Sequence, residues 1–84
     1  GAIEDYSKVI KLSPRNRSAY NNRGTVRRMK GDLQEAIQDF NRALDLDPKS
    51  AATYANRGNV RESLGDLRAA ITDYEKALEL APPR

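Results

Sequence analysis

The chain has 84 residues, of which 32% are charged, and it contains neither cysteine nor histidine. A chain of this length forms one domain or part of one. Without thiol or imidazole groups it has no disulfide, no thiolate metal site and no Ser–His or Cys–His nucleophile. Several carboxylates lie off the main apolar stripe of the predicted helices: Glu4, Asp39, Asp45, Asp73 and Glu79. We therefore expect no enzyme, no bound metal and no cofactor.

The net charge is +3, from 15 Lys and Arg residues against 12 Asp and Glu residues. Acidic and basic residues are interleaved along the chain, so this small excess makes nucleic acid the least favoured class of partner. No apolar run approaches the length of a membrane span, and no signal peptide is recognisable. We therefore expect a cytoplasmic protein that does not bind membranes.

The first predicted helix covers residues 2–12 and ends at Ser13-Pro14. Its apolar residues recur at helical spacing on one face: Ala2, Ile3, Tyr6, Val9 and Ile10. The second predicted helix, roughly residues 17–30, follows Asn16, whose side chain is a favoured N-cap. This second helix is less apolar than the first, and few residues supply its core face: Ala19, Tyr20, Gly24, Val26 and Met29.

The stretch of residues 31–48 carries the clearest helical pattern, with its own start and stop signals. Gly31 suits the left-handed conformation that ends a helix, and Asp32 can cap the next one together with Glu35. Pro48 ends it. The apolar residues between them follow one face of a helix: Leu33, Ala36, Ile37, Phe40, Ala43 and Leu44.

Ser50 is placed to cap a fourth helix from about Ala51 to Leu64. A second Gly-Asp pair, Gly65-Asp66, then leads into a fifth helix over residues 67–80. The loops between the five helices are about two to five residues long, so sequential helices should be antiparallel neighbours.

The same pattern is repeated at a period of 34 residues. Residues 17–50 and 51–84 align without a gap at sixteen identical positions, and residues 2–14 are a shorter copy. A period of this length is typical of stacked helical repeats. Each repeat has a glycine in its first helix and an alanine early in its second, so the two helices can cross closely. We expect the tightest contacts at Gly24 with Ala36 and at Gly58 with Ala70.

This pattern resembles the tetratricopeptide repeat, a helix–turn–helix unit of the same length. Tyr20 and Tyr54 stand where the family usually has Trp, and the other signature positions are filled twice: Gly24/Gly58, Ala36/Ala70, Phe40/Tyr74, Ala43/Ala77 and Pro48/Pro82. The resemblance implies an all-α solenoid of antiparallel helix pairs with a right-handed superhelical twist. It divides the chain into the second helix of a partial repeat, residues 1–16, and two full repeats, residues 17–50 and 51–84.

Four arginines repeat at positions where the family commonly has Leu and often has Tyr: Arg23, Arg27, Arg57 and Arg61. They could form a basic stripe that binds phosphate or an acidic peptide. We favour internal ion pairs with Asp5, Asp39 and Asp73, because acid and base recur at the same period. The four tyrosines, Tyr6, Tyr20, Tyr54 and Tyr74, fall at packing positions, which favours the core over stacking on nucleic-acid bases.

In the family that the chain resembles, the first helix of each repeat lines a concave groove that binds peptides. The matching polar residues here are Asn21, Asn22, Thr25, Arg28, Asn56, Asn59 and Glu62. Asparagines there can pair with the backbone of an extended peptide, which predicts a non-catalytic protein–protein interaction scaffold. The alternative, that these are ordinary solvated residues, stays open. The family's clamp for a terminal carboxylate is not expected, because Asn21 and Thr25 replace its Lys and Asn and only Asn56 matches.

A second hypothesis is a structural unit whose main partner is another copy of itself. The apolar residues of the first and last helices are too many for one neighbouring helix to cover. The candidates for self-association are Ile3, Tyr6, Ile10, Tyr74, Leu78 and Leu80. Exposed apolar surfaces at both ends would favour a homo-oligomer.

Overall fold

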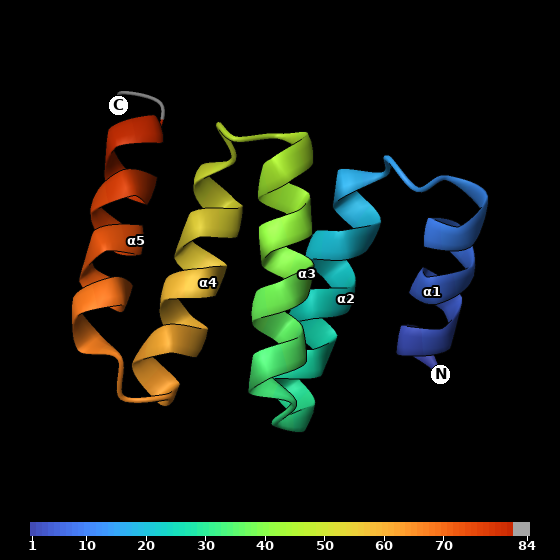
Figure 1. Ribbon diagram of the computed structural model, residues 1–84, viewed down its shortest axis with the longest axis horizontal. Coiled ribbons are helices and arrows are strands. Elements are labelled where there is room, and N and C mark those ends of the chain that lie inside the picture. The colour runs from blue at the N-terminus through green and yellow to red at the C-terminus, as the bar shows by residue number, and fades with distance from the viewer. Residues whose placement is uncertain (82–84) are drawn as a thin grey trace.

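The computed structural model describes residues 1–81 as five α-helices and the loops between them (Figure 1). The helices are α1 (Ala2–Leu12), α2 (Arg17–Lys30), α3 (Leu33–Leu46), α4 (Ala51–Ser63) and α5 (Leu67–Leu80). The five predicted helices are confirmed, with α4 ending one residue before the expected Leu64. Pro82, the predicted closing proline of the last repeat, lies outside the described residues.

The helices form a row in which each one packs against the next, with α1 and α5 at opposite ends (Figure 1). The helix α2 also contacts α4, so the first helices of the two full repeats lie side by side. Residues 1–81 contain no strand, which confirms the all-α solenoid. Within the same residues, no helix is long and apolar enough to cross a membrane.

Two helices begin with the caps that the sequence predicts. The side chain of Asn16 accepts a hydrogen bond of 3.1 Å from the backbone N–H of Ala19 at the start of α2. The hydroxyl oxygen of Ser50 accepts one of 3.3 Å from the N–H of Thr53 at the start of α4. Each bond satisfies a backbone donor that has no partner within its helix.

The predicted cap at Asp32 is wrong, because its side chain accepts no hydrogen bond from the first turn of α3. Gly31 turns the chain at φ 87°, and the Asp32 backbone then adopts ψ 69°. Asn16 and Ser50 cap at ψ 92° and 99°. Asp66, at ψ 74° after its own left-handed glycine, makes only a long cap bond of 3.4 Å. The tight glycine turn therefore aims these aspartates away from the helix N-terminus.

The glycines in the middle of α2 and α4 make room for aromatic rings. A Cβ atom added at Gly24 would lie 2.7 Å from the ring of Phe40, so the expected closest partner, Ala36, is corrected to Phe40. At Gly58 the added atom would lie 2.9 Å from the ring of Tyr74 and 3.3 Å from the backbone oxygen of Ala70. A ring reaches further from its own backbone than a methyl group, so it fills the space that the glycine leaves.

Candidate functional site

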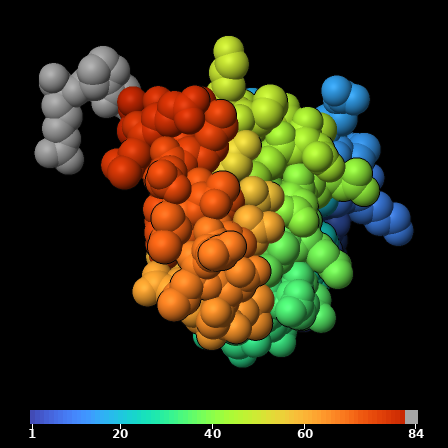
Figure 2. All heavy atoms as spheres, turned by 60° about the vertical axis from the view of Figure 1, so that its left-hand side comes forward, coloured from blue at the N-terminus to red at the C-terminus, as the bar shows by residue number. Residues whose placement is uncertain are grey.

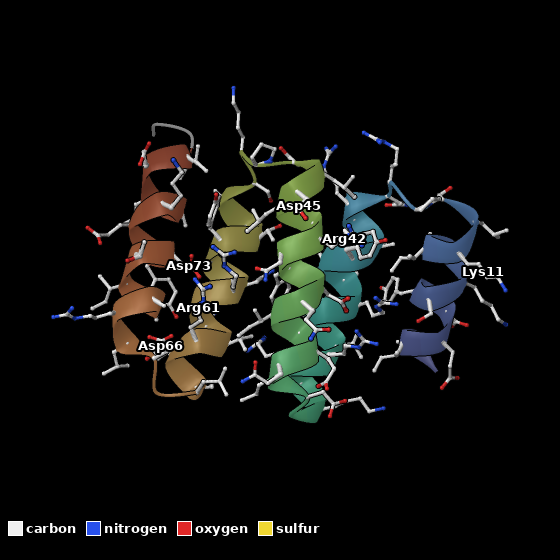
Figure 3. The ribbon with its side chains drawn as sticks, in the orientation of Figure 1. Lys11, Arg42, Asp45, Arg61, Asp66 and Asp73 are labelled. Carbon is white, nitrogen blue, oxygen red and sulfur yellow. The ribbon has the colours of Figure 1, made fainter. Side chains whose placement is uncertain are left out.

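Two clusters of one aspartate and two arginines join the helices within each full repeat. Arg23 donates two parallel hydrogen bonds to Asp39, and Nη1 of Arg27 adds a third at 3.0 Å. Arg57 and Arg61 hold Asp73 in the same way, and Arg61 and Asp73 point toward one another between α4 and α5 (Figure 3). Both aspartates are buried. The predicted internal role of the four arginines is thus confirmed for these two acids.

Asp5 does not follow this pattern, and its predicted arginine partner is not found. It is exposed and makes no ion pair within residues 1–81. The two arginines lie 16 and 12 residues before Asp39. The corresponding positions for Asp5 would precede Gly1, so the described chain contains no arginine at that distance.

Each first arginine also links its repeat to the one before. Nη1 of Arg23 donates to the hydroxyl oxygen of Ser7 at 3.1 Å, and Nη1 of Arg57 donates to Oδ1 of Asn41 at 2.8 Å. The hydrogen bond to Asp39 raises the pKa of Arg23, so the guanidinium stays charged. One planar group therefore holds three helices together.

The tyrosines pack as the sequence predicts, with one addition. Tyr20 is buried beneath Arg23, whose guanidinium carbon lies 5.8 Å from the ring centre, and Arg57 lies 5.4 Å above Tyr54. Tyr6, Tyr54 and Tyr74 are half-buried. The hydroxyl group of Tyr74 reaches polar residues of α4, so this side chain contributes to a surface as well as to packing.

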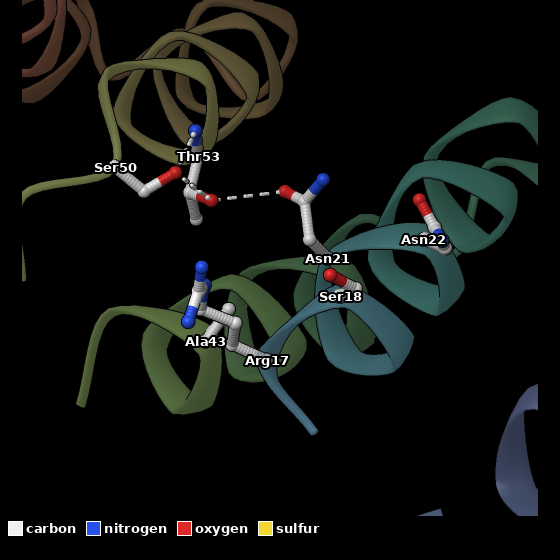
Figure 4. Close-up of a pocket in the computed structure, with 7 residues that line it drawn as sticks. All are labelled: Arg17, Ser18, Asn21, Asn22, Ala43, Ser50 and Thr53. Carbon is white, nitrogen blue, oxygen red and sulfur yellow. Dashed lines mark hydrogen bonds between the residues drawn. The ribbon is translucent and has the colours of Figure 1, made fainter. Parts of the chain in front are cut away.

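A polar pocket of about 150 Å³ lies between the first turns of α2 and α4 (Figure 4). Its lining residues are Arg17, Ser18, Asn21, Asn22, Ala43, Ser50 and Thr53. Oδ1 of Asn21 accepts from the hydroxyl of Thr53 at 3.1 Å and from Nδ2 of Asn56 at 3.2 Å. These hydrogen bonds tie the two first helices together along the groove.

Several predicted groove residues therefore already have partners within the chain. The side-chain oxygen of Asn21 and the side-chain nitrogen of Asn56 bind each other, and the hydroxyl of Thr25 donates to the backbone oxygen of Asn21 at 3.0 Å. Within residues 1–81 no hydrogen bond is made by Oδ1 of Asn56, by Nδ2 of Asn21 or by the amide of the exposed Asn22. These atoms are the groove's available donors and acceptors.

The other groove candidates meet around the hydroxyl group of Tyr74. This oxygen lies 2.6 Å from Oδ1 of Asn59 and 2.8 Å from Oε1 of Glu62. A tyrosine hydroxyl has one hydrogen and cannot donate to both acceptors. If it donates to Glu62, the Asn59 amide must turn to present its NH₂ group. Burial first, and Glu62 second, raise the pKa of Tyr74.

Arg28 lies close enough to this cluster for its charge to lower the pKa of Tyr74 against these larger effects. Its Nε atom is buried and has no hydrogen-bond partner within the described residues. A buried N–H without a partner costs free energy unless a ligand or water satisfies it. Arg28 is therefore the groove residue most in need of an external acceptor.

Sequence reasoning missed the contribution of Tyr74 to the groove, as well as that of Ser50 and Thr53. Tyr74 was placed in the core and among the residues for self-association, because its position on the repeat is a packing position. Ser50 was recognised only as a cap. Its bond of 2.8 Å to Thr53 continues to Asn21 across two helices, and no spacing within one helix signals such a link.

The comparison with protein families agrees with this geometry. Residues 15–82 match the sequence profile of the tetratricopeptide repeat. The chain belongs to the tetratricopeptide repeat family. This family is a protein-interaction fold that is generally non-catalytic. No relative is found among curated protein sequences.

Solved structures of other tetratricopeptide repeat domains resemble the chain closely. The first such domain of Spaghetti (RPAP3), bound to the HSP90 peptide SRMEEVD, has a TM-score of 0.93 and 32% identity over 98% of this chain and 65% of its own. The Arabidopsis OM64 domain has a TM-score of 0.92 and 35% identity over 95% and 66%. MamA has a TM-score of 0.89 and 26% identity over 93% and 46%. The chain thus spans about half to two thirds of these structures.

The residues predicted for self-association differ in how far they are exposed. Leu78 on α5 is 78% exposed. The other five, Ile3, Tyr6, Ile10, Tyr74 and Leu80, are half-buried within the chain itself. Leu12 at the end of α1, which was not among the candidates, is 85% exposed. The open apolar surface at the ends of this tetratricopeptide repeat chain therefore centres on two leucines.

Proposed function

We propose that the groove along α2 and α4 binds an extended segment of a partner protein, and that the chain acts as a non-catalytic scaffold. The observation that carries the proposal is the buried Nε of Arg28, which has no partner within residues 1–81. It lies in the same groove as the amide of Asn22 and Oδ1 of Asn56, whose hydrogen-bonding capacity is unused there. Together they present donors and acceptors that a peptide backbone and an acidic group can match.

The distance along the groove sets the length of the segment. Ser18 in the polar pocket and Arg28 are ten residues apart on one helix, which corresponds to about 15 Å. An extended peptide covers that distance with about five residues. Asn22 and Asn56 lie between these two ends in the sequence of their helices, where they can pair with backbone groups of the segment.

The chemistry at the Arg28 end favours an acidic group in the ligand. A carboxylate can accept from the unpaired Nε in a charge-assisted hydrogen bond. The RPAP3 domain, which is 32% identical, is bound to the peptide SRMEEVD, which contains three acidic residues. We infer that this chain prefers acidic segments, held by different residues from those of the family's carboxylate clamp.

The test is a fluorescence anisotropy titration with labelled heptapeptides that include SRMEEVD and versions with its acids neutralised. We expect Arg28→Gln to weaken binding of the acidic peptide by about tenfold or more. Asn22→Ala should weaken it by about two- to tenfold, because a neutral hydrogen bond is lost. Gln38→Ala, which removes an exposed amide on α3, is the matched control. Full-strength binding by a triple alanine variant at Asn22, Asn56 and Asn59 would rule out the groove.

The second candidate function is self-association, favoured by the exposure of Leu12 and Leu78 at the two ends of the row. Apolar surface of this kind is usually covered in an assembly. Light scattering over a range of concentrations should then show a rising mean mass, and Leu78→Asp should reduce it. A mass that stays at one chain up to millimolar concentration argues against this function.

A further inference from the structure

The outer face of α5 is open, whereas the equivalent face of α3 is covered. A shift of 34 residues relates α5 to α3, so every residue on one has a counterpart on the other. Leu44 on α3 is only 8% exposed because α4 packs against α3, but its counterpart Leu78 is 78% exposed. In Figure 2, α5 comes forward and no other helix lies in front of it in the described part of the chain.

A large apolar hollow marks the place where a covering helix is absent. It measures about 470 Å³ and is lined by Ala51, Ala52, Ala55, Tyr74, Ala77, Leu78 and Ala81. Four of these residues are the counterparts of Arg17, Ser18, Asn21 and Ala43, which line the small pocket of Figure 4. That pocket is only about 150 Å³ because Ser50 and Thr53 of α4 close it. The internal copy therefore indicates that the hollow fits a helix.

The helix that covers α3 does so with three residues spaced i, i+4 and i+7. Thr53 and Val60 are buried, and Val60 belongs to the core cluster with Ala36 and Phe40 of α3. Between them, Arg57 donates to Oδ1 of Asn41 on α3 at 2.8 Å. Two small or branched side chains around one arginine thus form the contact surface.

The helix α2 has the same three positions in its packing against α1. Ala19 is buried, Val26 is half-buried, and Arg23 between them donates to the hydroxyl of Ser7 on α1 at 3.1 Å. The same pattern, a small residue followed by arginine at i+4 and valine at i+7, is therefore used twice. In both cases the arginine binds an oxygen of the preceding helix.

The next acceptor in this series is a carboxylate. Ser7 and Asn41 are 34 residues apart, and the residue 34 positions after Asn41 is Glu75 on α5. Glu75 is exposed and makes no hydrogen bond or ion pair within residues 1–81. A carboxylate binds arginine more strongly than a hydroxyl or an amide oxygen does. The face of α5 therefore combines an apolar hollow with an unpaired negative charge.

We propose that the outer face of α5 docks an amphipathic helix of a partner protein that carries a small residue, an arginine four positions later and a valine seven positions later. The arginine binds Glu75, and the two other side chains fill the hollow beside Leu78. A second folded copy does not supply this helix, because α2 and α4 already bury their own versions of the pattern. The exposed acid of its α1, Asp5, has the wrong charge for Glu75.

The probe is a synthetic peptide with the sequence of residues 50–64, labelled and stapled on its solvent face because isolated short helices are marginal in water. We expect saturable binding to the 84-residue chain, with NMR shift changes at the amides of Glu75, Ala77 and Leu78. Leu78→Asp should abolish binding, and Leu12→Asp, an equally exposed leucine on α1, is the matched control.

A charge exchange tests the pairing directly. Glu75→Lys should weaken binding of the probe about tenfold or more, since an ion pair becomes a repulsion. A probe with glutamate in place of Arg57 should bind the Glu75→Lys chain and not the original one. The groove variant Arg28→Gln should leave docking unchanged, which separates this site from the proposed peptide groove.

Three results would overturn the proposal. The first is the absence of binding at millimolar probe. The second is binding that Leu78→Asp does not affect, because the probe would then have replaced α4 or docked elsewhere. The third is an association of the chain with itself through α1 that the probe does not displace, since a second copy would then be the occupant of the α5 face.

Discussion

Arg23 lies flat against Asp39, with Nε 2.9 Å from one carboxylate oxygen and Nη2 2.7 Å from the other. Asp39 is only 3% exposed, whereas the arginine side chain keeps contact with water. The pair closes each repeat from the inside at a position where related repeats commonly carry leucine. The same geometry recurs at Arg57 and Asp73, so this is a property of the repeat and not of one site.

We predict that Asp39→Ala lowers the free energy of unfolding by about 3 kcal/mol, because two arginines lose their partner in a largely buried place. Asp45→Ala, on the exposed side of the same helix, is the control and should change stability by less than about 0.5 kcal/mol. Urea denaturation followed by circular dichroism measures both. Equal stability of the two variants would show that the buried pair contributes little.

Gly24→Ala should destabilise the chain, although alanine is the better helix former. The new methyl group would lie 2.7 Å from the ring of Phe40, and such overpacking costs about 1–3 kcal/mol. The gain in helix propensity offsets about 1 kcal/mol of this cost. Ser18→Ala, at an exposed position of α2, serves as the reference for propensity alone. A melting temperature raised by Gly24→Ala would contradict the close approach of the ring.

The neighbouring asparagines of α2 should separate folding from binding. Asn21→Ala leaves Thr53 and Asn56 without their shared acceptor, so we expect a loss of about 1–2 kcal/mol in stability. Asn22→Ala removes no internal hydrogen bond and should stay within about 0.5 kcal/mol. Thermal melting compares the two, and peptide titration should show the opposite order of effects for Asn22. Equal losses of stability would mean that the Asn21 network is not formed.

Glu62→Gln should lower the pKa of Tyr74 toward its ordinary value near 10. The substitution removes both the hydrogen bond and the charge of Glu62, whereas burial, the largest cause of the raised pKa, remains. Alkaline titration of tyrosinate absorbance measures it, with Tyr74→Phe to identify the signal. Glu79→Gln, also at an exposed acid, is the control and should leave the titration unchanged.

The sign of the accompanying stability change follows from linkage. Because the folded chain has the higher pKa at Tyr74, it retains the proton over a range in which the unfolded chain has lost it. The contribution of this group to stability is full below the unfolded pKa near 10 and is lost as the pH rises through the folded pKa. Glu62→Gln should reduce that alkaline loss, and an unchanged profile would argue against the contact.

The amino-acid sequence by itself determined the helices and their repetition. Apolar spacing, the glycines at 31 and 65 and the prolines placed the five helices, because these signals act within a few residues. The shared period of Arg23, Arg27 and Asp39 also predicted which charges pair, since a repeated fold brings the same positions together each time. The cap at Asp32 failed because the preceding turn sets its backbone angle.

Only the tertiary structure decided which polar atoms remain available. Asn21 and Asn22 are adjacent and chemically identical, yet one is bonded across to α4 and the other is exposed. Leu44 and Leu78 hold the same position in two repeats, yet a following helix covers only the first. These differences depend on how neighbouring helices cross and on what lies beyond each repeat. Spacing along one helix carries no information about such distances, so the contacts between helices decide them.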